Sequence, residues 1–324
     1  MEMSKVHLIL LLLVLGICGC MKDEIPAPPH VAGDIETTQI SLRADYRYQI
    51  YFDLSSNQMI SQNLKTDWDL GFECIDEGWH IKLNGAKAMK VTLTNETNFA
   101  NIDDTTGDYI WKWDMESGNL DSTAIGDWRD HNNIYIIQRG YNEKGKYLGA
   151  IKIRFISLFE NKYIIEFSDI KDASTTIDTV SKLKDINYMS YSFDDGGKEI
   201  VLEPNKKDWD LLFSQYTTYF KEEDVTYLVT GVLQNPTGTS GTEDKIHEFK
   251  EITLESMTDL EFSDRIDNPG YDWKTYNFDQ GEYLVDVDRN YIFLTNEGFY
   301  KLRFIDYVDN QGERGAPLFE YQKL

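Results

Sequence analysis

The sequence has little cysteine, and this limits how its fold can be held together. Three cysteines occur in the 324 residues, at positions 18, 20 and 74. The first two lie at the end of an N-terminal apolar stretch, so Cys74 is the one thiol left for the folded part of the chain. A framework of internal disulfides is therefore excluded. Cys74 stands before the apolar Ile75, a setting typical of a buried small hydrophobic side chain.

Long hydrophobic runs are also lacking. The run centred on LILLLLVL at 8–15 is shorter than the roughly 20 apolar residues that span a bilayer. It follows Lys5 and ends in small residues, which predicts a secretory signal over residues 1–19. The sequence ICGC at 17–20 resembles a bacterial lipobox, so Cys20 is expected to be the lipidated first residue of the mature protein. An ordinary signal peptide, cleaved to release a soluble protein, is the alternative.

Residues 20–40 are expected to tether the folded part to the lipid anchor. Prolines at positions 26, 28 and 29 favour an extended chain there. The sequence KDE at 22–24 resembles the acidic signal with which Bacteroidetes lipoproteins reach the outer face of the outer membrane. We therefore expect a lipid-anchored outer-membrane protein that is exposed at the cell surface.

Basic residues are scarce relative to acidic ones. The chain has 32 Lys and Arg against 56 Asp and Glu, a net charge of −24, which argues against nucleic acid as a partner. Catalytic motifs are lacking as well, since there is no Ser/His/Asp signature, no H-E-x-x-H, no phosphate loop and no Cys/His cluster. The sequence therefore predicts a protein that is not an enzyme and has no metal-ligating cluster.

Aromatic residues, by contrast, are abundant. They make up 13% of the chain, with 20 Tyr and 7 Trp, and such side chains suit the pleated surface of a β-sheet. Gly, Asn and Asp interrupt the sequence about every ten residues, and no long amphipathic helix stands out. The sequence predicts an all-β fold.

One eight-residue motif occurs twice, as KTDWDLGF at 65–72 and KKDWDLLF at 206–213. Each copy follows a predicted hairpin and precedes further matched segments in the same order. This order predicts a tandem duplication, with unit 1 at 41–172 and unit 2 at 186–324. We expect two related antiparallel β units packed together. The matched segments are Trp111-Lys112 with Trp273-Lys274, NIYIIQ at 133–138 with NYIFLT at 290–295, and KIRFI at 152–156 with KLRFI at 301–305.

Alternation within the repeated motifs predicts which side chains are buried. Trp68 and Trp209 are expected in the core. The aspartates beside them are expected to accept hydrogen bonds from nearby backbone N–H groups, in preference to binding metal or acting as acid and base. These aspartates are Asp67, Asp69, Asp208 and Asp210. The basic residues of the two K-x-R-F-I strands are expected to face away from the core, over acidic neighbours; they are Lys152, Arg154, Lys301 and Arg303.

The second unit resembles the HmuY family of Bacteroidetes outer-membrane lipoproteins. The resemblance rests on KDWDLLF with its preceding hairpin and on the C-terminal stretch that contains NYIFLTNEGFYKLRFIDY. Residues 186–324 resemble one whole family unit, and 44–170 resemble a second, more diverged copy. The resemblance implies a protein that captures haem from host carriers and passes it to a TonB-dependent outer-membrane receptor.

The resemblance also implies two axial ligands for the haem iron, from loops between the W-D-L strand and the late strands. They are His in some members and Met in others, and both side chains ligate haem iron. The candidates in the second unit are His247 and Met257, and in the first unit His80 and His131. Two histidines in the first unit, or His with Met in either unit, would make a pair.

A surface β-domain that binds a protein or glycan partner without haem is the second hypothesis. Tryptophan side chains stack on sugars when they are exposed on one face. The candidates for such a glycan platform are Trp79, Trp111, Trp113 and Trp128.

Overall fold

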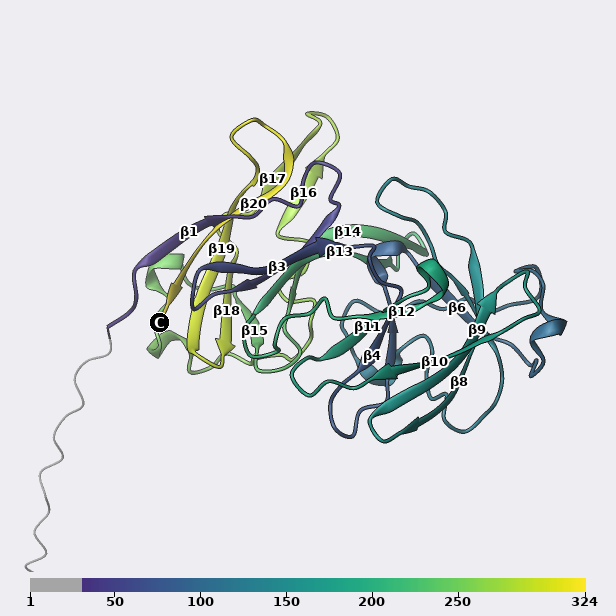
Figure 1. Ribbon diagram of the computed structural model, residues 1–324. Helices are drawn as coiled ribbons and strands as arrows, with labels where there is room; N and C mark the ends of the chain where they lie inside the picture. Colours follow the sequence, from purple (N-terminus) through teal and green to yellow (C-terminus); the bar gives the residue numbers. More distant parts are fainter. Residues whose placement is uncertain (1–30) are drawn as a thin grey trace, which may run out of the picture. The chain divides into compact units, whose positions relative to one another are not determined.

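The computed structural model describes residues 31–324, of which Gly33–Leu324 form one compact unit. Its regular secondary structure is almost wholly antiparallel strand, so the predicted all-β fold is confirmed (Figure 1). No helix in the described part of the chain is long and apolar enough to cross a membrane. The predicted signal over 1–19 and the predicted lipidation site Cys20 lie outside the described residues.

The strands form two β-sandwiches, each with one five-stranded and one four-stranded sheet. The first sandwich contains β4 (Leu70–Glu73), β5 (Ile81–Leu83), β6 (Lys90–Leu93), β7 (Tyr135–Gln138), β8 (Ala150–Phe159), β9 (Lys162–Asp169), β10 (Thr176–Ser181), β11 (Tyr188–Ser192) and β12 (Lys198–Ile200). The second contains β1 (Ile35–Gln39), β2 (Tyr48–Asp53), β3 (Gln58–Leu64), β13 (Leu211–Phe220), β14 (Val225–Gln234), β15 (Ser240–Asp244), β18 (Asn290–Thr295), β19 (Gly298–Val308) and β20 (Arg314–Lys323).

Short elements fill the connections. A two-stranded sheet consists of β16 (Lys274–Asn277) and β17 (Glu282–Val285). The helices described are single turns of 3₁₀ type: η1 (Gly85–Lys87), η2 (Phe99–Asn101), η3 (Leu120–Ser122), η4 (Asp194–Gly196), η5 (Phe249–Glu251) and η6 (Glu255–Met257).

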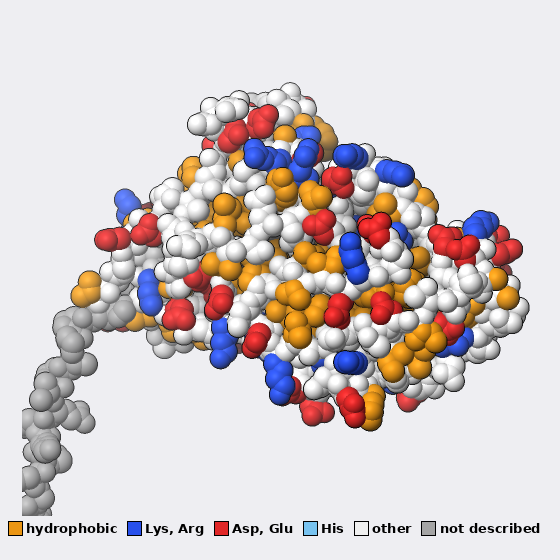
Figure 2. Space-filling view, viewed as in Figure 1, with side chains coloured by type: hydrophobic (Ala, Val, Ile, Leu, Met, Phe, Trp, Pro, Cys, Tyr) orange, Lys and Arg blue, Asp and Glu red, His pale blue; other side chains and the backbone are white. Residues whose placement is uncertain are grey.

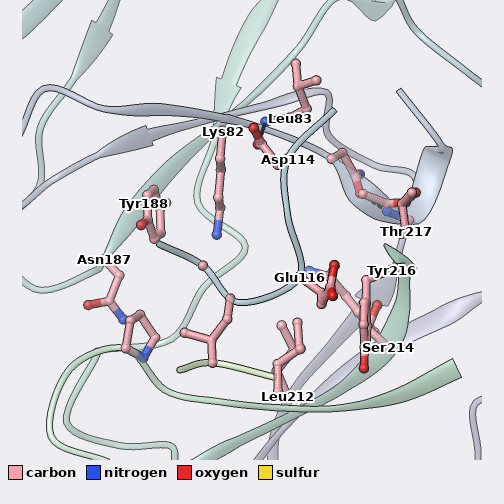
Figure 3. A pocket seen from close by; sticks show the side chains of 18 of the residues that line it. Lys82, Leu83, Asp114, Glu116, Asn187, Tyr188, Leu212, Ser214, Tyr216 and Thr217 are labelled. Carbon is pink, nitrogen blue, oxygen red and sulfur yellow. Dashed lines mark hydrogen bonds between the residues drawn. The ribbon is translucent and has the colours of Figure 1, made fainter. Parts of the chain in front are cut away.

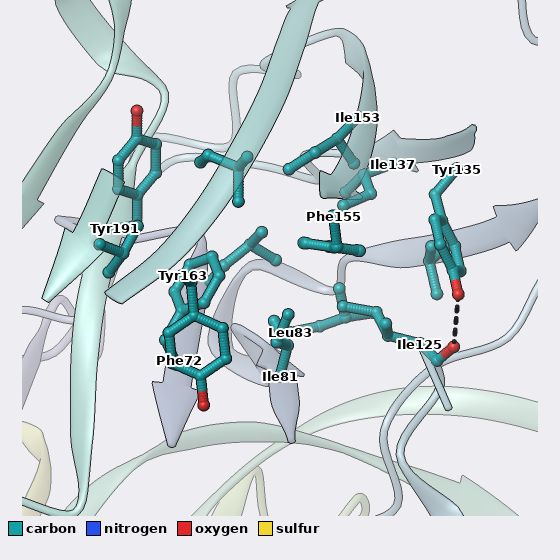
Figure 4. Close-up of a cluster of buried hydrophobic side chains, with 14 of the residues drawn as sticks. Phe72, Ile81, Leu83, Ile125, Tyr135, Ile137, Ile153, Phe155, Tyr163 and Tyr191 are labelled. Carbon is teal, nitrogen blue, oxygen red and sulfur yellow. Dashed lines mark hydrogen bonds between the residues drawn. The ribbon is translucent and has the colours of Figure 1, made fainter. Parts of the chain in front are cut away.

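The two sandwiches have the same strand order. The five-stranded sheets run β10-β9-β8-β7-β6 and β1-β20-β19-β18-β15, and the four-stranded sheets run β12-β11-β4-β5 and β3-β2-β13-β14. In each sandwich the apolar faces of the two sheets enclose one core. Figure 4 shows that of the first sandwich, where Phe72 of one sheet meets Phe155 and Tyr163 of the other. The equivalent core of the second sandwich centres on Phe52, Phe213 and Phe319.

The sandwiches do not coincide with the repeats in the sequence. The hairpin β2–β3 precedes the first W-D-L motif, yet β2 pairs with β13, which follows the second. In return β11 pairs with β4. The first sandwich is thus contiguous in sequence, whereas the second joins both ends of the chain. The predicted ranges 41–172 and 186–324 describe the repeat in the sequence and not the grouping of strands in space.

The W-D-L motif fastens these exchanged hairpins. An oxygen of Asp69 accepts a hydrogen bond from the backbone N–H of Phe193, at 2.8 Å, just after β11. An oxygen of Asp210 accepts the equivalent bond from Leu54, at 2.9 Å, just after β2. The predicted backbone hydrogen bonds of these two aspartates are confirmed. Each motif copy holds the hairpin that comes from the other half of the chain.

The two motif tryptophans differ in their burial. Trp209 is 5% exposed, as expected of a core residue. Trp68 is half-buried, and its indole N–H donates to the side chain of Gln49 at 3.3 Å. The expectation that Trp68 lies in the core was therefore wrong.

In the K-x-R-F-I strands, the arginines face acidic neighbours as expected, but the lysines do not. Arg154 pairs with Glu166 at 3.0 Å and Arg303 with Glu320 at 2.7 Å, so the arginines lie over acidic neighbours on the sheet. The lysines do not, and this part of the prediction was wrong. Lys152 and Lys301 are buried, and each ammonium donates to two backbone carbonyls of a 3₁₀ turn.

The register of the late strands corrects two matches made from the sequence. Lys152 faces Ile136 and Lys301 faces Ile292, so the asparagines of NIYIIQ and NYIFLT are out of register by one residue. The match of Trp111 with Trp273 was also wrong. Trp273 stacks on Phe304 in the core of the second sandwich, and in the first sandwich it is Trp128 that contacts the equivalent Phe155. Trp128 is therefore the structural counterpart of Trp273, because both pack against the same core phenylalanine, whereas Trp111 shares only the Trp-Lys sequence.

Candidate functional site

Two of the four candidate ligands are histidines held by buried carboxylates. His80 lies just before β5, and its Nδ1 is 2.6 Å from an oxygen of Glu73. His247 follows β15, and its Nδ1 is 2.9 Å from an oxygen of Asp244. The Glu73 and Asp244 side chains are 4% and 0% exposed, against 15% for His80 and 32% for His247. In each histidine Nε2 makes no hydrogen bond to another described residue.

The loop around His247 is organised by the same carboxylate. One oxygen of Asp244 accepts the backbone N–H groups of Ile246 and His247 at 2.8 and 3.0 Å, and the other faces the imidazole. Burial of Asp244 opposes its ionisation, but these hydrogen bonds outweigh it and hold the pKa of the carboxyl below its ordinary value. The carboxylate fixes both the loop and the orientation of the ring.

The other two candidate ligands have structural surroundings. Nδ1 of His131 faces the backbone N–H of Asn133 at 3.3 Å, and Nε2 faces the hydroxyl of Tyr135 at 3.2 Å, so both ring nitrogens are occupied. Met257 is 7% exposed and packs in an apolar cluster with Ile252 and Ile292. His80 and His131 belong to the first sandwich, and His247 and Met257 to the second. No hydrogen bond, ion pair or ring contact in the described part of the chain joins any two of the four.

None of the four tryptophans proposed for a glycan platform is fully exposed; Trp113 is half-buried, with its ring centroid 5.7 Å from that of Tyr219. Trp128 is 2% exposed, so the expectation that it faces solvent was wrong. The ring of Trp79 stacks on His80, with 3.9 Å between the centroids, and the guanidinium of Arg129 lies 3.8 Å from the Trp79 centroid. Trp111 is half-buried and packs against an apolar cluster on the outer face of the five-stranded sheet.

An open groove of about 420 Å³ lies beside β15 and β18 in the second sandwich. Its walls include five carboxylates and four tyrosines, with no His, Met or Cys. Its two arginines are already paired, Arg265 with Asp267 at 2.6 Å and Arg289 with Glu243 at 2.7 Å. The acidic residues are Glu116, Glu243, Glu261, Asp267 and Asp272, and the tyrosines are Tyr216, Tyr219, Tyr271 and Tyr291.

A smaller cavity, of about 150 Å³, lies where the two four-stranded sheets meet (Figure 3). Its volume matches one aromatic ring, so it is far smaller than a porphyrin. Its walls include the two motif tryptophans, Trp68 and Trp209, together with residues that no motif in the sequence pointed to, among them Lys82, Asp114, Tyr188 and Glu203. An Ile-Lys-Leu alternation at 81–83 is the pattern of a half-exposed strand, so the sequence offered no sign of a site there.

Charged groups are spread over the surface. On the face shown in Figure 2, acidic and basic side chains are interspersed, and hydrophobic side chains form several separate patches. The two arginines of the groove are both paired, so the groove presents no unpaired basic group for an anionic ligand.

Comparison with known proteins gives one family and several distant structures. The sequence matches the HmuY protein family over residues 45–321, a single match that runs through both copies of the W-D-L motif. A search of curated proteins gives no match. Apo PinO from Porphyromonas gingivitis is 9% identical, with a TM-score of 0.25, 89% of this chain and 96% of that chain covered. The apo HmuY analog of Tannerella forsythia is 10% identical, with a TM-score of 0.25 and coverages of 93% and 98%. Both likenesses are distant, so the assignment rests on the family match.

Proposed function

The chain belongs to the HmuY family, and from this premise we propose that it is a non-catalytic surface protein that binds haem, with His247 as an axial ligand of the iron. Haem bound there would supply a transported iron centre. The residues of the chain would hold and orient it without carrying out a reaction.

The observation that carries this proposal is the bond between His247 and Asp244. Histidines that bind metals almost always donate their other ring N–H to a carboxylate or carbonyl, which fixes the tautomer and turns the free nitrogen outward. Nδ1 of His247 faces the buried Asp244 at 2.9 Å, so the proton lies on Nδ1 and the lone pair of Nε2 is available to a metal. His80 has the same arrangement with Glu73, but its side chain is 15% exposed against 32% for His247. His247 therefore leaves more room for a macrocycle.

Among residues 31–324, neither His131 nor Met257 offers a free donor as a second axial ligand. His131 uses both of its nitrogens, and Met257 packs in an apolar cluster. The donor set therefore supports one imidazole per iron in the described arrangement. This differs from the pair expected from the family resemblance.

The cellular setting is part of the proposal. We infer that Cys20 carries the lipid anchor, that the protein lies on the outer face of the outer membrane, and that a TonB-dependent receptor accepts its cargo. The resemblance of residues 17–20 to a lipobox supports the anchor. A host haem carrier is the corresponding source of haem.

Haemin titration of the lipid-free mature chain, residues 21–324, tests the proposal. We expect a saturable Soret band whose position and visible bands indicate one nitrogen ligand from the protein. His247→Ala should remove it, while His131→Gln and His80→Ala should keep it.

Two results would contradict the assignment. A broad shoulder that never saturates would mean that the fold has no haem site, and it would favour the haem-free hypothesis of a protein or glycan partner. A band that is lost in His80→Ala and kept in His247→Ala would move the ligand to the first sandwich.

A further inference from the structure

The cavity of about 150 Å³ lies between the outer faces of the two four-stranded sheets. Strand alternation explains which side chains reach it. On β2, Ile50 and Phe52 face the core of the second sandwich, so Gln49 and Tyr51 face outward. On β5, Ile81 and Leu83 are buried in the first sandwich, so Lys82 between them points the other way. Each sandwich thus contributes its second, more polar face to the walls.

The ammonium of Lys82 ends inside this cavity (Figure 3). It makes no hydrogen bond and no ion pair with any residue between 31 and 324. Its contacts are aromatic: Nζ lies 3.6 Å from the ring centroid of Tyr188 and 5.6 Å from that of Trp68. Burial lowers the pKa of the Lys82 amine, as expected for a cation removed from water. The cation–π contacts with Tyr188 and Trp68 compensate only part of the hydration energy that the ammonium loses.

The nearest carboxylates are committed to backbone groups. The oxygens of Asp114 accept the backbone N–H groups of Leu83 and Ala124, both at 2.6 Å. The oxygens of Glu203 accept those of Asn187 and Tyr188, at 3.1 and 3.0 Å. Burial raises the pKa of both carboxyls, that of Asp114 to about 6. These groups attract Lys82 from a distance, but neither supplies it with a direct partner.

Other polar atoms in the walls also have no partner. Trp209 and Tyr216 are 5% and 6% exposed, and neither the indole N–H nor the hydroxyl makes a hydrogen bond within the described chain. The same holds for the hydroxyl of Thr123 and one oxygen of Glu116. Buried polar groups are nearly always paired in folded proteins, so a cluster of unpaired ones around one cavity needs an explanation.

We propose that this cavity binds a small carboxylate whose apolar body is about the size of one ring. The carboxylate would supply the counter-charge that Lys82 lacks and accept hydrogen bonds from Trp209 and Tyr216. The volume accommodates a single ring, and side chains such as Leu212 and Ile266 provide the apolar walls.

The open groove gives this ligand a route in. Glu116 and Tyr216 line both the groove and the cavity, so the two spaces adjoin at these residues. The proposed site is separate from His247, which lines neither space.

Calorimetric titration with benzoate, phenylacetate and 3-methylbutanoate tests the proposal on the mature chain. We expect at least one of these carboxylates to bind with a stoichiometry of one. The uncharged isostere, such as benzamide for benzoate, should bind about ten- to a hundredfold more weakly, because a hydrogen bond to a charged group is lost.

Two variants locate the ligand. Lys82→Met keeps the aliphatic stem and should weaken binding of the carboxylate about tenfold or more, while raising the melting temperature because a half-buried charge without an ion-pair partner is gone. Trp209→Phe removes the indole N–H and should weaken binding with little change in packing. Lys146→Met, at an exposed turn, is the matched control and should bind as the native chain does.

Three outcomes would overturn the proposal. They are failure of all three carboxylates to bind, equal binding of the acid and its amide, and unchanged carboxylate binding in Lys82→Met. The haemin titration is independent of this result, since Lys82→Met should leave the Soret band unchanged. A failure of either proposal can therefore be told from a failure of the other.

Discussion

Asp69 and Asp210 occupy the same position in the two copies of the W-D-L motif, yet only Asp69 has cations beside it. Both side chains are buried, and both accept a backbone N–H from an exchanged hairpin. Asp69 also pairs with the ammonium of Lys87 and with the guanidinium of Arg139, at 2.9 Å. Asp210 makes no ion pair within residues 31–324; the hydroxyl of Thr239 donates to it at 3.4 Å, and the carboxyl of Asp53 lies beside it. The aspartate that the two motif copies share therefore has a different electrostatic environment in each copy.

This difference predicts opposite responses to the same substitution. Asp69→Asn leaves the buried Lys87 without its counter-charge and leaves Arg139 paired with Asp194 alone, so we expect it to lower the free energy of unfolding by about 3–5 kcal/mol. Asp210→Asn keeps an acceptor for the N–H of Leu54 and removes an uncompensated charge. It should cost less than about 1 kcal/mol at pH 5 and stabilise the protein at pH 8. Urea unfolding of both variants at the two pH values is the measurement, and equal losses at both sites would contradict the assignment.

The dependence of stability on pH follows from Asp210. Burial raises the pKa of its carboxyl to about 7, above the ordinary value of 3.8. Between these two values the folded state holds a proton that the unfolded state has lost. The free energy of unfolding should thus fall as the pH rises from about 4 to about 7, and this contribution should be constant above that.

The size of this effect is on the order of 4 kcal/mol as an upper bound, at about 1.4 kcal/mol per pH unit. Asp114, with a pKa raised to about 6, contributes with the same sign over a narrower range. The Asp210 contribution is therefore isolated as the difference in the free energy of unfolding between the native chain and Asp210→Asn, measured by urea unfolding from pH 4 to 8. A difference that does not change with pH would show that Asp210 is ionised throughout.

The buried lysines of the two K-x-R-F-I strands give a prediction that tests the repeat. Lys152 donates to the carbonyls of Phe99 and Ile102 at 2.7 and 2.5 Å. Lys301 donates to those of Phe249 and Ile252 at 2.7 and 3.0 Å.

Replacing either lysine by methionine keeps the stem and leaves two carbonyls unpaired. We expect a loss of about 1–3 kcal/mol for each of Lys152→Met and Lys301→Met, and similar losses at both sites. Lys162→Met, at an exposed position of β9, is the control. Thermal unfolding is sufficient, and a neutral effect at either buried site would mean that the 3₁₀ turn is held by other contacts.

Substitution of Trp128 and of Trp111 tests which of the two is the structural counterpart of Trp273. Trp128 is 2% exposed and contacts Phe155 with 5.8 Å between the ring centroids, as part of the main core. We expect Trp128→Ala to cost about 3–5 kcal/mol and Trp273→Ala to cost as much. Trp111→Ala removes a half-buried side chain and should cost clearly less. Denaturant unfolding is the measurement. Equal losses of unfolding free energy in Trp111→Ala and Trp128→Ala would support the match of Trp111 with Trp273 that was made from the sequence.

The sequence by itself determined the fold class, the repeat and the family. Alternating aromatic and polar residues can bury one face only as strands, and a repeated order of motifs survives as a repeated order of strands. Backbone-bonding roles for Asp69 and Asp210 followed because short carboxylates at strand ends lie near free N–H groups.

Which hairpin joins which sheet was decided only by the tertiary structure. The hairpins β2–β3 and β11–β12 look alike in sequence, so local letters do not say whether each pairs within its own repeat or with the other. The same limit hid the cavity around Lys82. Its walls come from strands far apart in the chain, and a lysine between two apolar residues looks like any half-exposed strand position until the second sheet covers it.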